Sequence, residues 1–209
     1  MAIFNRIFAR HAHYTMKHQD DHNPGISHLG AIQAIKMGRL LADLHIKDTT
    51  QYTFPVLSEI FVSKYLRTHQ TAEIIAMVYE IHGLPVPAIN KTNDDEKSAP
   101  KMTEFATSDA RYPESSVLCI SHKPALPNQF AKIVDASLAW DTGSMLFIDK
   151  SASDDKSGAF FTQENNEIAK EFADISHDLF TCAVTGVHFL AGGKDDAPQK
   201  IDPVHFAKL

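Results

Sequence analysis

Two arginines and two histidines of this chain have side chains that could together bind an anion and attack it. Arg10 and His11 are adjacent near the start, whereas Arg67 and His122 follow at wide separations. An arginine offers a planar fork of permanently charged donors that matches phosphate oxygens, and a neutral imidazole is a competent nucleophile near neutral pH. Phosphoryl transfer needs cationic donors around three equatorial oxygens and an in-line nucleophile. The four residues therefore predict phosphoryl transfer, provided that the fold brings them together.

Two predicted strands deliver three of these residues to one edge of a sheet. Residues 3–9 are rich in β-forming side chains and end at Arg10 and His11. Residues 117–121 form a continuous apolar run, typical of a strand buried on both faces, and His122 comes directly after it. We therefore expect Arg10, His11 and His122 to lie close together at the carboxyl ends of these two strands.

The fourth residue, Arg67, belongs to a second strand and helix. Residues 59–63 are predicted to form a short strand, and residues 71–81 a helix that stops at Gly83. Arg67 falls between the two elements. Ser63 has the residue type of a helix N-cap, and capping is the role that we assign to it.

The remaining elements complete a layered α/β pattern. Ser27 is predicted to cap a helix that contains Leu29 to Leu44. Two further strands are expected at residues 86–89 and 144–148, and a helix is expected at 130–138. Near the end of the chain, loops at 151–158 and 192–198 are expected to flank a helical or mixed segment at 164–180. Alternating strands and helices predict a three-layer α/β/α sandwich with a mainly parallel sheet, whose ligands bind beyond the carboxyl ends of the strands.

The residues around the four positions resemble the histidine phosphatase superfamily, which includes the cofactor-dependent phosphoglycerate mutases. The resemblance covers about residues 4 to 148, and its motifs occur in the family's order and spacing: Phe8 to Ala12, Ile26 to Ala34, Val62 to Ala72, and Ile120 to His122. Four ordered blocks are far more specific than an Arg-His pair alone. The resemblance implies a phosphoglycerate mutase-like fold.

The resemblance also implies site roles. His11 would become transiently phosphorylated, Arg10, Arg67 and His122 would bind the phosphoryl group, and water would then release phosphate without a metal or another cofactor. The stretches 122–126 and 142–144, together with Ala12, are more similar to the small phosphohistidine phosphatases than to the mutases. The implied substrate is a phosphorylated small molecule or a phosphoprotein.

The chain departs from the mutase pattern at the general acid. Mutase-like members place a glutamate between the second arginine and the second histidine, and no clean match is found here. Glu104 is the candidate acid, with Glu96 and Asp109 as alternatives. Residues 13–18 also differ from the usual mutase pattern, which leaves the substrate and any mutase activity open.

Bulk properties restrict the partners and the compartment. The formal net charge is -6, which disfavours nucleic acid and anionic membranes as partners. Cys119 and Cys182 form no CxxC pair, and the start of the chain lacks a signal-peptide core, so we expect a cytoplasmic protein. The 209 residues fit a single domain, in which residues 151–209 match nothing familiar.

Two alternatives remain open. His11 and His13 after a strand resemble the paired metal ligands of amidohydrolase barrels, and His18, His22 and His28 enrich the same region. Such a barrel usually needs about 250 residues, which exceeds this chain. The second alternative is a module that binds phosphate without turning it over.

Overall fold

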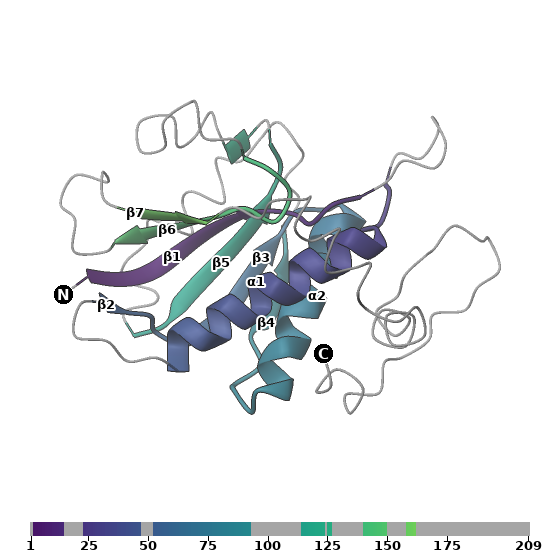
Figure 1. Cartoon of the computed structure of the whole chain (residues 1–209). Coiled ribbons are helices and arrows are strands. Elements are labelled where there is room, and N and C mark those ends of the chain that lie inside the picture. Colours follow the sequence, from purple (N-terminus) through teal and green to yellow (C-terminus); the bar gives the residue numbers. More distant parts are fainter. Residues whose placement is uncertain are drawn as a thin grey trace.

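The structure is a computed structural model of the whole chain, and it describes residues 2–14, 23–46, 52–92, 114–123, 125–126, 140–149 and 158–161. One sheet of seven strands and two helices make up these residues (Figure 1). The helices are α1 (His28–Ile46) and α2 (Leu66–Ile81). The strands are β1 (Ala2–Arg10), β2 (Tyr52–Thr53), β3 (Leu57–Val62), β4 (Ala88–Lys91), β5 (Ser116–Ser121), β6 (Met145–Asp149) and β7 (Gly158–Phe161).

The sheet is mixed, with the order β4-β3-β5-β1-β6-β7, and β2 pairs with β1. Strands β4, β3, β5 and β1 are parallel to one another, whereas β6 is antiparallel to β1 and β7 is antiparallel to β6. This confirms the predicted α/β class with a largely parallel central sheet. The antiparallel edge was not predicted, because an apolar run indicates a strand but not its direction.

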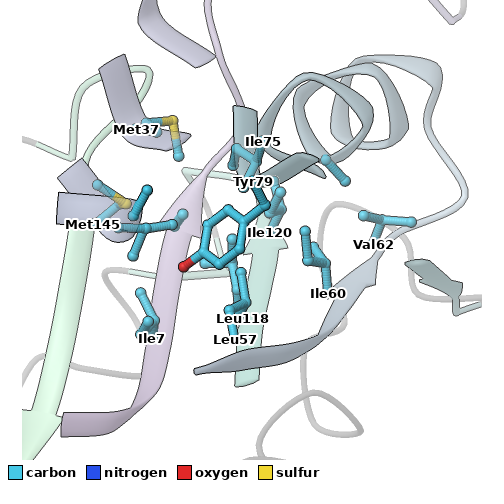
Figure 2. Packing of buried hydrophobic residues seen from close by; sticks show 14 of the residues in the cluster. Ile7, Met37, Leu57, Ile60, Val62, Ile75, Tyr79, Leu118, Ile120 and Met145 are labelled. Atoms are coloured by element: carbon cyan, nitrogen blue, oxygen red, sulfur yellow. The ribbon is translucent and has the colours of Figure 1, made fainter. Parts of the chain in front are cut away.

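The core lies between the sheet and both helices. Ile7, Leu118 and Ile60 are in register on β1, β5 and β3, and they pack with side chains of α1 and α2, such as Met37 and Tyr79 (Figure 2). The next residues along these strands, Phe8, Phe61 and Cys119, point to the opposite face and are buried too, as is Leu146 of β6, which pairs with Phe8. Burial on both faces explains the continuous apolar runs. The helix predicted at 130–138, on which a third layer depends, lies outside the described residues.

Helix α1 begins where the sequence predicted, because Ser27 caps it. The Gly30 N–H donates to Ser27 Oγ at 3.1 Å. The first turn packs so closely on the preceding loop that a Cβ on Gly30 would lie 2.1 Å from the His13 carbonyl oxygen. Farther along, a Cβ on Gly38 would lie 2.9 Å from the Val78 Cβ of α2. Two glycines thus set how closely α1 approaches its neighbours.

Helix α2 begins earlier than predicted. It starts at Leu66 rather than at Thr71, so Arg67 lies in the first turn and not between strand and helix. The prediction was wrong because apolar periodicity marks only the part of a helix that faces the core. The cap assigned to Ser63 was also wrong: Tyr65 is the N-cap residue and makes no side-chain cap hydrogen bond.

Smaller differences concern the edge strands. β4 begins two residues later than the predicted strand at 86–89, and β6 matches the strand predicted at 144–148 to within one residue at each end. β2 was not predicted, and β7 begins at Gly158, where a loop was expected to end. The segment predicted at 164–180 lies outside the described residues. None of the helices in the described ranges is long and apolar enough to span a membrane.

Candidate functional site

Strand register brings the ends of β1 and β5 together. Arg10 pairs with Ser121, so His11 and His122 are the next residues of two adjacent parallel strands. The His11 N–H donates to the Ser121 carbonyl oxygen at 3.1 Å, and the His11 and His122 ring centroids are 5.1 Å apart. The predicted meeting of these histidines at one edge of the sheet is confirmed.

His11 is held with its Nε2 unprotonated. The side chain is 2% exposed, and its Nδ1 lies 2.7 Å from the Ala12 carbonyl oxygen. A carbonyl can only accept a hydrogen bond, so Nδ1 carries the proton. Nε2 then accepts from Arg67 Nε at 3.3 Å. This tautomer turns the unprotonated nitrogen, the one that could act as a nucleophile, toward the Arg67 guanidinium.

The surroundings of His11 also keep it neutral. Burial lowers its pKa well below the ordinary value of 6.5, and the nearby His122, Arg67 and Arg10 lower it further. The hydrogen bond to Ala12 acts in the opposite direction without reversing the shift. At neutral pH the imidazole therefore keeps the lone pair that a nucleophile requires.

Arg67 joins the two histidines. Its side chain is 3% exposed, and Nη2 lies 3.4 Å from His122 Nδ1, while Nε contacts His11. The guanidinium also lies over two tyrosine rings, with Cζ 4.8 Å from the Tyr14 centroid and 4.6 Å from the Tyr65 centroid. Ring contacts of this kind orient the guanidinium and stabilise its charge at a buried position.

The same tyrosines contact the histidines edge-on. The ring centroids of Tyr14 and His11 are 5.3 Å apart at an interplanar angle of 64°, and those of Tyr65 and His122 are 5.0 Å apart at 81°. Sequence reasoning missed both residues. The available signal was position: Tyr14 follows His11 by three residues, and Tyr65 precedes Arg67 by two.

Arg10 is the last residue of β1 and belongs to the same cluster. Its Nη1 donates to the Trp140 carbonyl oxygen at 2.7 Å, whereas its buried Nε has no hydrogen-bond partner among the described residues. Burial lowers the pKa of Arg10, with Tyr14 and Asp141 opposing the shift and Arg67 adding to it. The two arginines are thus close enough to repel, an arrangement that an anion between them would relieve.

His122 is anchored from behind by hydroxyl groups. Its Nε2 lies 2.8 Å from Ser63 Oγ, which lies 3.1 Å from Thr68 Oγ1. Ser63 and Thr68 are fully buried, and His122 is 2% exposed. Neither hydroxyl was predicted as a site residue, although both lie within the motif from Val62 to Ala72.

The loop after His11 is fixed by side chains from distant elements. The His13 N–H donates to Gln33 Oε1 at 2.7 Å, and Gln33 Nε2 donates to Thr142 Oγ1 at 3.2 Å. The Gly143 N–H donates to the His11 carbonyl oxygen at 3.2 Å, in a turn where Gly143 has φ 78°. A left-handed conformation favours glycine, which explains this residue beside the site.

In the metal-dependent alternative, His13 would bind a metal together with His11, but in the structure its Nδ1 contacts a serine. His13 Nδ1 is 2.7 Å from Ser27 Oγ, and burial lowers the pKa of His13, with Arg10 adding to the shift. Within the ranges that the structure describes, no three His, Cys, Asp or Glu side chains are grouped so that they could hold a metal ion. His18 and His22 lie outside those ranges.

Glu104, Glu96 and Asp109 all lie outside the described residues. The described part of the site is cationic and aromatic: two guanidiniums, two tyrosine rings and the His122 imidazole surround the His11 imidazole. Such a set suits a small oxoanion.

Comparisons with known proteins agree on the fold. The putative phosphohistidine phosphatase SixA from Agrobacterium tumefaciens is similar over 78% of this chain and 100% of its own, with a TM-score of 0.55 and 16% identity. A protein histidine phosphatase SixA in complex with tungstate matches equally well, over 78% of this chain and 98% of its own (TM-score 0.55, 16% identity).

A phosphoglycerate mutase from Bacillus anthracis str. Sterne is similar over 81% of this chain and 96% of its own, with a TM-score of 0.51 and 12% identity. No protein-family model matches the sequence. No curated protein matches it either. The likeness is one of structure, and it shows that the chain has the fold shared by phosphohistidine phosphatases and phosphoglycerate mutases.

Proposed function

We propose that this chain is a metal-independent phosphatase that transfers a phosphoryl group to His11 and then to water. One observation carries the proposal: the unprotonated Nε2 of a buried, neutral His11 is directed toward the Arg67 guanidinium, beside His122. A phosphorus atom held by these donors would lie against that nitrogen. The proximity of Arg10 adds a second permanent charge.

The proposed reaction has two steps. His11 Nε2 attacks phosphorus in line with the leaving group, forming a P–N bond as the bond to the leaving group breaks. Arg10 and Arg67 hold the equatorial oxygens, and His122 donates a hydrogen bond that strengthens as charge develops. Water then attacks the phosphohistidine and restores His11. Glu104 is the candidate for protonating a poor leaving group.

We propose phosphohistidine in a protein as the first substrate class to test. Two of the similar structures are of phosphohistidine phosphatases, and the proposed site needs no strong acid for a P–N bond, whose leaving group departs readily once protonated. A phosphorylated small molecule is the second class. Selectivity between them depends on loops around the shared core.

The test is to trap the intermediate. Brief reaction with a radiolabelled phosphorylated histidine or aryl phosphate, followed by quenching, should leave label on the wild-type protein. The label should survive alkali and decay in acid, as a phosphohistidine does, and His11→Ala should carry none. His13→Ala is the matched control and should still be labelled.

Three results would overturn the proposal. They are near wild-type turnover by His11→Ala, label that alkali removes as it removes an aspartyl phosphate, and activity abolished by a chelator and restored by a divalent metal. Oxoanion binding without turnover of any phosphorylated compound would instead identify a binding module.

A further inference from the structure

A chain of hydroxyl groups runs from His122 to the backbone at the start of α2. His122 Nε2 contacts Ser63 Oγ at 2.8 Å, Ser63 Oγ contacts Thr68 Oγ1 at 3.1 Å, and Thr68 Oγ1 contacts the Tyr65 carbonyl oxygen at 2.7 Å. Thr68 Oγ1 also lies 3.2 Å from the Ser63 carbonyl oxygen. The chain thus ends on two groups that can only accept.

This ending fixes the direction of every hydrogen bond in the chain. A hydroxyl has one proton and two lone pairs. Thr68 must use its proton on a carbonyl oxygen, so Ser63 donates to Thr68 and must accept from His122. The Tyr65 N–H occupies the other Ser63 lone pair at 3.4 Å. His122 therefore carries a proton on Nε2.

The opposite nitrogen of His122, Nδ1, then carries a lone pair in the free protein. His122 Nδ1 faces Arg67 Nη2 at 3.4 Å, and a guanidinium can only donate, so this contact agrees with an unprotonated Nδ1. An oxoanion that entered beside it would meet that lone pair. A favourable contact with the anion requires a second proton, on Nδ1.

We propose that the Ser63–Thr68 hydroxyl chain makes His122 an imidazolium whenever the site holds a phosphoryl group, so that anion binding takes up a proton. The proton moves to Nδ1 from solvent or from a monoprotonated phosphoryl group. The proposal rests on the proposed function, because it concerns the same anion site. Ser63 and Thr68 act through His122 and are positioning residues.

The groups that face His122 explain why its ring gains a second proton only when an anion binds. His11 faces it from the end of β1, Arg67 from α2 and Tyr65 from the segment before α2, while Arg10 lies in the same cluster and Lys123 follows it along the chain. Without an anion, the cationic members of this set oppose an imidazolium at His122. A dianion between them reverses that balance.

Calorimetry with tungstate tests the coupling, because tungstate brings no proton of its own at mildly alkaline pH. Titrations in two buffers of different ionisation enthalpy give the number of protons taken up. Wild-type protein should take up roughly one proton per tungstate at His122. Ser63→Ala and Thr68→Val should take up clearly less, because Nδ1 can then hold the single proton of a neutral ring.

Thr68→Ser is the matched control, since it keeps the hydroxyl and should keep the uptake. Nitrogen-15 NMR of the His122 ring gives a readout that is independent of turnover. It should show a proton on Nε2 alone in the free protein, and on both nitrogens with tungstate bound. In Ser63→Ala with tungstate, it should show a neutral ring with the proton on Nδ1.

Equal uptake in wild type and Ser63→Ala, or a neutral Nδ1–H ring in tungstate-bound wild type, would overturn the inference. Absence of tungstate binding by wild type would count against the proposed phosphatase itself. The free-protein spectrum would still decide the hydroxyl chain in that case, because a proton on Nδ1 there would contradict it.

Discussion

His11 and His122 are held in opposite tautomers by different devices. A backbone carbonyl accepts a hydrogen bond from His11 Nδ1–H, and a serine hydroxyl accepts one from His122 Nε2–H. Each ring therefore turns an unprotonated nitrogen toward Arg67. Two residues of the same type thus have different proposed tasks, attack and anion binding, because their partners differ.

The lowered pKa of His11 predicts how activity depends on pH. In a profile of kcat/KM, the acid limb that belongs to His11 should lie well below pH 6.5, because the nucleophile stays neutral there. The measurement is hydrolysis of an aryl phosphate across the acid range. An acid limb of His11 at or above 6.5 would contradict the burial argument.

The same shift predicts how stability depends on pH. Because the folded-state pKa of His11 is lowered, the unfolded chain binds a proton that the folded protein does not, and acidification below 6.5 favours unfolding until the folded-state pKa is reached. His11→Gln cannot titrate, so it should lose less stability than wild type between about pH 7 and about pH 5. Urea unfolding at both pH values measures the difference.

Tyr65 offers a test of the aromatic contacts on Arg67. Tyr65→Leu removes the ring that lies 4.6 Å from the guanidinium and should weaken oxoanion binding by about 0.5–2 kcal/mol, roughly 2- to 30-fold. Tyr65→Phe keeps the ring and is the control. Tungstate inhibition constants compare the two. Equal inhibition of both variants would show that the ring contributes nothing.

At the scale of elements, the close contact between the first turn of α1 and the residues after His11 fixes where those residues lie. Gly30→Ala would place a Cβ against the His13 carbonyl, so helix or loop must move. We expect a loss of stability of about 1–3 kcal/mol together with a loss of activity. Gly38→Ala, which crowds Val78 on α2 instead, should lower stability but keep activity per folded molecule. Thermal melts and steady-state rates separate these outcomes.

The elements that the sequence predicted well are those with apolar runs or clear caps. β1, β5 and α1 were located because buried strands and a serine cap leave local signals. The first turn of α2 was missed because it faces the site, so its buried side chains are polar: Arg67, Thr68 and Gln70. Periodicity of apolar residues cannot detect a turn of that kind.

The site was predictable to the same extent. Arg10, His11 and His122 follow from strand ends, and Arg67 from its motif. The tyrosine contacts and the hydroxyl chain depend on loop and cap conformations, which apolar patterns do not predict, so nearness in sequence to His11 and Arg67 was their one signal. Ser63 shows the difference, since its residue type indicated a cap and its surroundings made it a partner of His122.

At the scale of the whole molecule, an acidic chain carries a cationic site. The net charge of -6 should exclude large polyanions, while a small oxoanion can reach two arginines and two histidines. Tungstate at about 100 times its Kd should therefore stabilise the protein by about 2.7 kcal/mol, measured as a raised Tm. Arg67→Met should show a much smaller shift, and an equal shift would place the anion elsewhere.

The segment after β1 has a consequence for folding. Main-chain groups of residues 11–13 are held by Ser121, Gly143, Thr71 and Gln33, which come from a strand, a turn and two helices spread over more than half of the chain. No local unit contains enough of these contacts to orient the nucleophile. The proposed catalysis would thus be a property of the cooperative native state, and we expect a partly folded chain to be inert toward phosphorylated compounds.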